Sequence, residues 1–105
     1  MAQKKERHWT IYCLIDPRTA LPFYVGRTQA PLRRRYDHTH RAWSALRGQK
    51  SLFRRVREIR DAGMRPSFAI IERTLDPARE DFHIRRLAKM FALVNSASNQ
   101  QRRAA

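Results

Sequence analysis

Arg34 and His38 are the first residues whose types and spacing suit chemistry on a phosphate. They lie four positions apart, so on a helix both side chains can point toward one place. A guanidinium grips phosphate through two parallel hydrogen bonds, and an imidazole can transfer a proton near neutral pH. The alternative is a solvated basic face of a helix, which spacing alone favours because charged side chains are mostly exposed.

Glu80 is the second candidate for a chemical role. Together with Ile84, Leu87 and Phe91 it follows the i, i+4, i+7, i+11 pattern, which places all four on one stripe of a helix. A carboxylate aligned with core residues needs a cation beside it. The helix pattern favours stabilisation by the helix N-terminus or by an arginine. The alternative is a ligand for Mg²⁺, which prefers one or two carboxylates with water and phosphate oxygens.

Tyr12 and Tyr24 form the third candidate. Residues 8–15 and 21–25 are rich in aromatic and β-branched side chains, which predicts two antiparallel strands joined by a loop over residues 16–20. Symmetric pairing about this loop would place Tyr12 opposite Tyr24, with both side chains on one face. Gly26 is expected to end the second strand and to permit close approach of the backbone. The alternative is that both tyrosines are half-buried packing residues.

Hydrophobic periodicity predicts the elements that position these residues. Helices are expected over residues 31–46, over residues 50–62 up to Gly63, and from a cap at Asp76 to about residue 91. Residues 67–73 predict a third strand. The pattern indicates an α+β fold, with a small three-stranded antiparallel sheet flanked by helices in the order β-β-α-α-β-α.

The same periodicity predicts which side chains form the core. In the first strand, Tyr12 and Leu14 should face one way, and the other face should carry Ile11, Cys13 and Ile15. The first helix should bury a stripe made of Leu32, Tyr36, Trp43 and Leu46.

Charge is the strongest signal in the composition. The 105 residues include 23 Lys and Arg against 9 Asp and Glu, a net charge of +14. Such a surface attracts polyanions, with nucleic acid as the leading partner and an anionic membrane as the second. The length suits a single domain over residues 1–105, with a core at about residues 8–97 and flexible basic ends.

Cysteine usage and hydropathy limit the protein class further. Cys13 is the only cysteine, which excludes a disulfide within the chain and a thiolate metal cluster. No apolar run reaches the length of a membrane span, and the N-terminus lacks the apolar segment of a signal peptide. We therefore expect a cytoplasmic protein with no membrane partner.

The three candidates together resemble the GIY-YIG nuclease superfamily. Its two tyrosine motifs match Thr10-Ile11-Tyr12 and Tyr24-Val25-Gly26, with Thr10 standing where the family often has glycine. The resemblance covers residues 8–97. The further positions that match the family pattern, in chain order, are Arg34, His38, Glu80 and Asn95.

The resemblance implies a metal-dependent endonuclease that hydrolyses phosphodiester bonds in DNA with little sequence preference. Glu80 would hold one Mg²⁺ or Mn²⁺ ion, and Tyr12 would be the general base on the attacking water. Tyr24 would orient the water or the phosphate. The remaining roles are phosphate neutralisation by Arg34, proton transfer by His38 and positioning of a neighbouring group, including the metal shell, by Asn95. Family members often carry separate DNA-recognition domains, so a protein partner could supply specificity here.

Gly26 and the arginines outside this set are expected to bind DNA or RNA through its backbone. Such contacts position a strand without reading its sequence, and they make affinity depend strongly on salt. The arginines expected to make these contacts are Arg27, Arg33, Arg35, Arg41, Arg54, Arg55, Arg57 and Arg60. Two rival interpretations are a non-catalytic nucleic-acid-binding module on the same fold and a small basic assembly protein, such as a ribosome-associated factor.

Overall fold

The computed structural model describes residues 8–36 and 50–95, and the predicted flexible ends lie outside this part of the chain. The elements follow the order β1 (Trp9–Asp16), β2 (Leu21–Thr28), α1 (Pro31–Tyr36), α2 (Lys50–Asp61), β3 (Ser67–Thr74) and α3 (Arg79–Ala88). The strands form one antiparallel sheet in the order β2-β1-β3. The predicted fold class and element order are confirmed.

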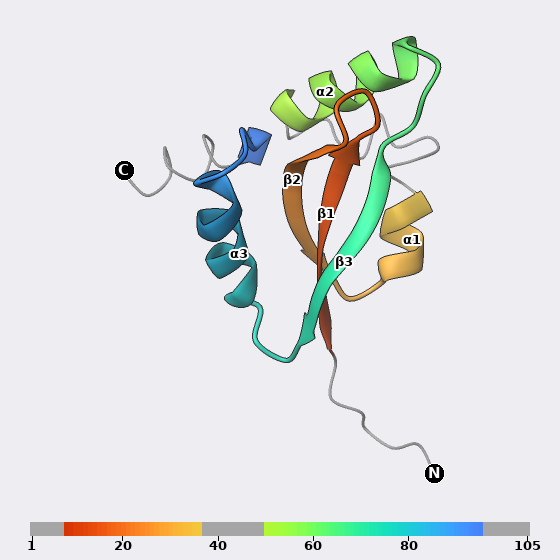
Figure 1. The fold of residues 1–105 in the computed structure, drawn as a ribbon. Coiled ribbons are helices and arrows are strands. Elements are labelled where there is room, and N and C mark those ends of the chain that lie inside the picture. Colours follow the sequence, from red (N-terminus) through yellow and green to blue (C-terminus); the bar gives the residue numbers. More distant parts are fainter. Residues whose placement is uncertain (1–7, 37–49, 96–105) are drawn as a thin grey trace.

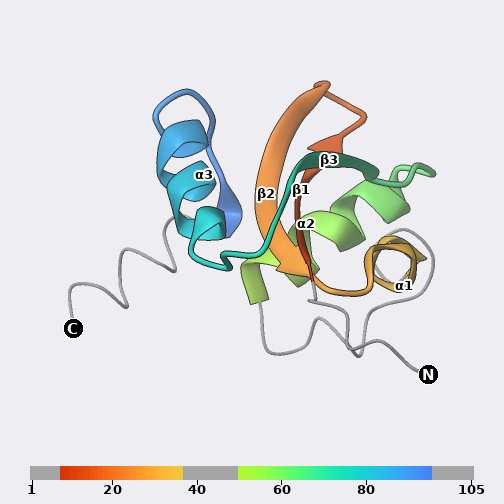
Figure 2. The ribbon, with the colours of Figure 1, turned by 90° about the horizontal axis from the view of Figure 1, so that it is seen from below.

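Helices cover both faces of the sheet (Figures 1 and 2). On one face, Tyr12 and Leu14 pack against α2 through Leu52, Val56 and Ile59. On the opposite face, residues of β1 and β2 pack against Ile84 and Leu87 of α3; those strand residues are Ile11, Cys13 and Val25. The predicted alternation along β1 is therefore confirmed, and Cys13 is a buried free thiol in the core.

The register of the β1–β2 hairpin differs from the prediction. Tyr12 lies opposite Gly26, and Tyr24 lies opposite Leu14. The turn is one residue shorter than expected because Asp16 pairs with Leu21, and an irregularity beside Leu14 adds a further offset. The two offsets shift the register by two residues in total. Because side chains alternate between faces with a period of two, Tyr12 and Tyr24 remain on the same face. The expectation that Gly26 ends β2 is wrong, because the strand continues to Thr28.

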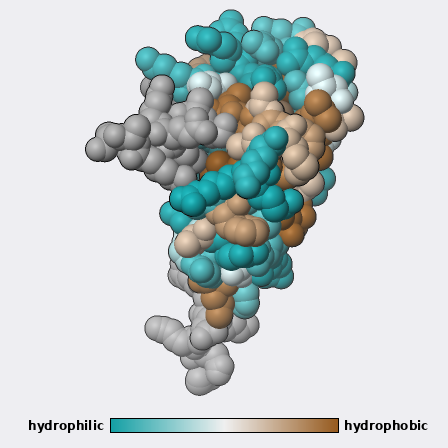
Figure 3. Space-filling model, turned by 60° about the vertical axis from the view of Figure 1, so that its left-hand side comes forward, coloured by the Kyte–Doolittle hydropathy of each residue, from teal (hydrophilic) through white to brown (hydrophobic). Residues whose placement is uncertain are grey.

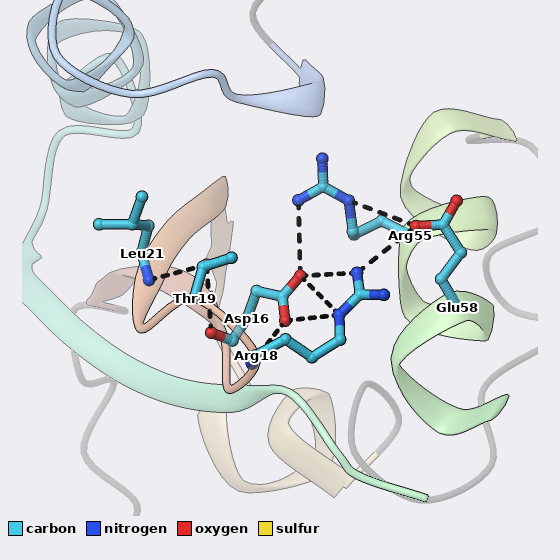
Figure 4. A network of polar contacts seen from close by, with 6 residues as sticks. All are labelled: Asp16, Arg18, Thr19, Leu21, Arg55 and Glu58. Carbon is cyan, nitrogen blue, oxygen red and sulfur yellow. Dashed lines mark hydrogen bonds and ion pairs between the residues drawn. The ribbon is translucent and has the colours of Figure 1, made fainter. Parts of the chain in front are cut away.

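The turn between β1 and β2 is built around the buried carboxylate of Asp16 (Figure 4). Its Oδ1 accepts hydrogen bonds from the backbone N–H of Arg18 at 2.9 Å and from Arg18 Nε at 3.0 Å. Arg18 Nη2 donates to Oδ2 at 2.8 Å, and Nη1 of Arg55 from α2 lies 3.8 Å from the same oxygen. The network ties the hairpin turn to α2.

The first helix departs from its prediction. Its described part, α1, has six residues and buries none of them. Leu32 is 81% exposed and Tyr36 is 48% exposed, so their assignment to a core stripe is wrong. Trp43 and Leu46, the other members of that stripe, lie outside the described residues.

The second helix follows its prediction closely. It ends at Asp61, and Gly63 adopts a φ of 79°. The N–H of Gly63 bonds to the carbonyl of Arg60 at 2.9 Å, and the N–H of Met64 bonds to that of Ile59 at 3.1 Å. These two bonds form a Schellman motif, in which glycine tolerates the left-handed conformation without a steric penalty.

The position of α3 against β3 depends on a chain of polar contacts around His83. His83 Nε2 lies 2.7 Å from Glu72 Oε1, and Arg86 Nη2 lies 3.0 Å from His83 Nδ1. Because a guanidinium can only donate, Nδ1 is the acceptor and Nε2–H donates to Glu72. Arg79 Nε also donates to Glu72, at 3.0 Å. The prediction that Asp76 caps this helix is wrong, because the N-cap is Ala78, which makes no side-chain cap hydrogen bond. Asp76 Oδ1 accepts instead from the N–H of Ala78 at 2.9 Å, and the helix, Arg79–Ala88, is shorter at both ends than predicted.

No helix in the two described stretches has both the length and the apolar character needed to cross a lipid bilayer.

Candidate active site

Tyr12, Tyr24 and Gly26 form one compact cluster at the β1–β2 pair. The ring centroids of the tyrosines are 6.2 Å apart, with the planes tilted by 49°. Gly26 lies under both rings: a Cβ added there would collide with the Tyr12 hydroxyl, would lie 2.6 Å from Tyr12 Cζ and 2.9 Å from Tyr24 Cε2. The glycine thus makes room for the two phenols, as the close-approach hypothesis required.

Phe68 is a member of this cluster that sequence reasoning missed. Its ring stacks on Tyr12 with centroids 4.5 Å apart and an interplanar angle of 17°. Phe68 lies in β3 opposite Leu14, so its side chain shares the face of Tyr12. The sequence did show an aromatic residue in the third predicted strand, but its position beside Tyr12 depends on the strand register, which the sequence did not predict. Phe68 holds the Tyr12 ring from the side of β3.

Electrostatic interactions connect the cluster to Arg34 and Glu80. Burial is the largest cause that raises the pKa of the Tyr12 hydroxyl above its ordinary value. The charge and hydrogen bond of Tyr24 and the charge of Glu80 also raise this pKa, and Arg34 lowers it. Arg34 lies on α1 and Glu80 in the first turn of α3, so elements from both sides of the sheet act on one hydroxyl. Tyr12 is a neutral phenol in the free protein.

The Glu80 carboxylate has a cation beside it, as its position in the sequence required. Oε1 of Glu80 lies 3.7 Å from Nε of Arg27 on β2, and the two side chains are 25% and 42% exposed. Arg27 also donates from Nη1 to the Pro77 carbonyl at 3.2 Å. Its guanidinium carbon lies 5.0 Å from the ring centroid of Trp9. Arg27, predicted to contact phosphate, therefore has three partners within the protein.

The donors of this site suit a cation that takes most of its ligands from elsewhere. Glu80 is the only carboxylate among the proposed site residues, and the described residues contain no group of three or more His, Cys, Asp or Glu that could hold a metal. Mg²⁺ commonly binds through one or two carboxylates and keeps water and phosphate oxygens as its other ligands. The residues fit an ion shared between Glu80 and a phosphate, and they exclude a cage of protein ligands within residues 8–36 and 50–95.

Asn95 fixes the strand that carries Tyr24 and Gly26. Its Nδ2 donates to the carbonyl of Val25 at 2.6 Å, and its Oδ1 accepts from the Val25 N–H at 3.4 Å. Val25 lies between the two motif residues on β2, which is an edge strand. The amide thus pairs both backbone groups of one residue at an open sheet edge, so Asn95 positions its neighbours through the backbone.

The arginines predicted to bind the nucleic-acid backbone lie mainly on α1 and α2. Figure 2 places these helices on one side of the sheet and α3 on the other. Arg33, Arg35, Arg54 and Arg57 are exposed there. Arg55 also contacts Glu58 and the ring of Phe23, in addition to Asp16. The predicted His38 and Arg41 lie outside the described residues, and Arg60 is half-buried.

The side of the molecule formed by α3 is also largely hydrophilic. Figure 3 shows this side, where apolar patches interrupt the polar surface. Phe82 and Met90 are exposed large apolar side chains from this region. Arg79 lies 4.2 Å from the centroid of the Phe82 ring, a cation–π contact.

The structure thus brings Tyr12, Tyr24 and Gly26 into contact, connects Arg34 and Glu80 to them electrostatically, and ties Asn95 to β2 through the backbone of Val25. Comparisons of the chain with protein-family models, with curated proteins and with solved structures each gave no match.

Proposed function

We propose that this protein is a metal-dependent endonuclease that hydrolyses phosphodiester bonds in DNA with little sequence preference, as its resemblance to the GIY-YIG nucleases implies. One observation carries the proposal: Tyr12 and Tyr24 pack together over Gly26, where the charges of Arg34 and Glu80, from distant parts of the sequence, act on the buried Tyr12 hydroxyl. The net charge of +14 supports a polyanionic substrate. The buried thiol of Cys13 is compatible with a reducing cytoplasm, where we place the activity.

The resemblance gives each residue of the proposed site a role. Arg34 neutralises the scissile phosphate as negative charge develops. Tyr24 orients the attacking water or the phosphate, and Tyr12, in its ionised form, accepts the proton of that water. Glu80 holds one Mg²⁺ or Mn²⁺ ion, which, when bound, supplies positive charge that stabilises the phosphate and the leaving oxygen. Asn95 keeps β2 in place, and His38 receives the proton from Tyr12.

Cleavage of supercoiled plasmid tests the proposal directly. Nicking is expected with Mg²⁺ or Mn²⁺ and is expected to disappear with EDTA, because without the metal no positive charge stabilises the leaving oxygen. Glu80→Gln should lower the nicking rate at least about tenfold, since a neutral amide is a poor ligand for a hard cation. Branched DNA and RNA, assayed in parallel, identify the preferred substrate.

Asp81→Asn is the matched control for this experiment. Asp81 is the next residue of α3 and pairs with Arg85 at 3.1 Å, so the variant removes the same charge from the same helix turn. Its nicking rate should stay within about twofold of the wild type. Equal rates for wild type and Glu80→Gln would rule out Glu80 as the metal ligand.

The rival function is a nucleic-acid-binding module without catalysis. The Arg27–Glu80 ion pair favours it, because this contact gives Glu80 a structural partner. The rival predicts tight, salt-sensitive binding to DNA and no cleavage with any divalent cation. A protein partner that supplies specificity is compatible with either function.

The pH dependence of cleavage tests the role of Tyr12. Its pKa is raised, so the ionised form is scarce near neutral pH and grows about tenfold per pH unit. If Tyr12 is the base, the nicking rate at saturating metal should rise from pH 6 to pH 9 on a logarithmic slope near one. Tyr12→Phe should lose this slope. A flat wild-type profile would contradict a base role and leave Tyr12 as a hydrogen-bond donor.

A further inference from the structure

Arg27 forms an ion pair with Glu80, whose carboxylate is the metal ligand in the proposed function. Its Nε lies 3.7 Å from Glu80 Oε1, on a strand that also presents Tyr24 and Gly26. Its Nη1 donates to the Pro77 carbonyl just before α3, and its guanidinium carbon lies over the ring of Trp9 at the start of β1. These contacts hold a guanidinium beside the acid, so a divalent cation that approaches Glu80 meets a competing positive charge.

We propose that Arg27 is a positioning residue that couples metal binding to nucleic-acid binding. In the free protein it pairs with Glu80 and weakens metal binding. When a nucleic-acid strand binds, Arg27 moves to a backbone phosphate and releases Glu80 to the metal. This inference rests on the proposed metal role of Glu80, and it adds a regulation of that site.

The geometry suits an exchange of partners better than a permanent ion pair. At 3.7 Å the Arg27–Glu80 contact is longer than a charge-assisted hydrogen bond, and both side chains remain partly exposed. Ion pairs of this kind are weak because water screens them. A phosphate offers Arg27 a bidentate partner, which a carboxylate at this distance does not. Breaking the Arg27–Glu80 ion pair therefore costs little free energy, and the new contact of Arg27 with a phosphate contributes more.

Linkage makes the proposal measurable. If nucleic acid removes a competitor of the metal, the metal must raise the affinity for nucleic acid by the same factor. Removing Arg27 should therefore tighten metal binding to the free protein, weaken nucleic-acid binding, and reduce the coupling between them.

The first experiment measures Mn²⁺ binding to the protein without nucleic acid, by the loss of the electron paramagnetic resonance signal of free Mn²⁺. Arg27→Gln should bind Mn²⁺ about three- to tenfold tighter than the wild type. Arg27→Lys keeps the positive charge, and its affinity for Mn²⁺ should equal that of the wild type. Arg85→Gln is the matched control, since it removes one positive charge from the last turn of α3 and the ion pair of that charge with Asp81 in the first turn. Its affinity should change less than about twofold.

Glu80→Gln separates failure of this inference from failure of the proposed function. Loss of Mn²⁺ binding in Glu80→Gln, with equal affinity in wild type and Arg27→Gln, would overturn the exchange and leave the metal site intact. Unchanged binding in Glu80→Gln would overturn both. No measurable binding by Arg27→Gln would also overturn the exchange. Arg27→Met, which keeps the apolar stem over Trp9, replaces Arg27→Gln should that variant fail to fold.

The second experiment follows Arg27 through the ring that it covers. Protein labelled with 5-fluorotryptophan gives a ¹⁹F resonance for Trp9, assigned by its absence in Trp9→Phe. Adding a DNA hairpin in EDTA should shift this resonance in the wild type, because Arg27 leaves the ring. Arg27→Gln should show less than about half of that shift at saturating DNA. An unmoved wild-type resonance, or an equal shift in both proteins, would contradict the exchange.

Discussion

Gly26→Ala is expected to abolish nicking and to lower the free energy of unfolding by about 3 kcal/mol. The new methyl group would meet the Tyr12 hydroxyl and approach Tyr12 Cζ to 2.6 Å and Tyr24 Cε2 to 2.9 Å, so atoms must move. The Tyr12 ring cannot retreat easily, since Phe68 stacks on it at 4.5 Å. Either the rings or the β1–β2 pair must shift, and both changes displace the hydroxyls of the proposed site.

Thermal unfolding and plasmid nicking measure the two effects. A loss of about 3 kcal/mol corresponds to a Tm lower by roughly 12 to 20 °C for a domain of this size. Gly63→Ala is the control, because Gly63 has a φ of 79° but no atom within 4 Å of an added Cβ. Backbone strain alone should cost it about 1 kcal/mol, with nicking unchanged. A Gly26→Ala protein with wild-type Tm and activity would contradict the close packing of the two phenols.

The sequence was sufficient to predict the fold class because periodicity reports which face a side chain occupies. Alternation placed Tyr12 and Cys13 on opposite faces of β1, as observed. Register is a different kind of information, since it depends on a shorter turn and one irregular step near Leu14. Neither has a clear signal in the letters DPRTA. The sequence therefore predicted that Tyr12 and Tyr24 share a face of the sheet, but it did not predict their cross-strand partners.

The candidate site was predictable only in its residue types. The sequence required a cation near Glu80, but it could not say that Arg27 from β2 supplies it at 3.7 Å. It suggested a positioning role for Asn95, and the partner is the backbone of Val25, 70 residues earlier. Such contacts depend on how α3 and the following segment return to the sheet. A prediction of tertiary partners therefore needs the packed structure, even where each residue is correctly singled out.

The turn at Asp16 was predicted as turn material, yet it carries the most buried carboxylate among the described acidic residues. Three hydrogen bonds from the Arg18 side chain, one from its backbone, and the charge of Arg55 all favour the ionised form. The side-chain hydrogen bond of Arg18 is the largest cause that lowers the pKa of Asp16, and burial opposes it. The carboxylate has 3% of its side chain exposed, so solvent screens these contacts little.

Asp16→Asn should lower the free energy of unfolding at pH 7 by about 2 to 3 kcal/mol. The amide keeps the shape but loses the charge, and Arg18 retains an exposed fraction of 33%, so its guanidinium can be hydrated. Asp61→Asn is the control, since Asp61 pairs with Arg57 at 3.9 Å on the surface and both side chains are mostly exposed. That variant should change stability by less than about 0.5 kcal/mol.

The deficit of Asp16→Asn should depend on pH in a specified direction. Because the folded pKa of Asp16 is lower than its ordinary value, the stabilisation is complete above the unfolded pKa of about 3.9. It is lost as the pH falls through the folded pKa, where the wild-type carboxyl becomes neutral like the amide. Urea unfolding of both proteins should therefore show a constant deficit from pH 7 to about pH 5 that narrows below pH 4. Glu72, whose pKa is lowered chiefly by its hydrogen bond from His83, contributes equally to both proteins and cancels in the difference. A deficit that stays constant down to pH 2 would show that shape, not charge, makes Asp16 important in the turn.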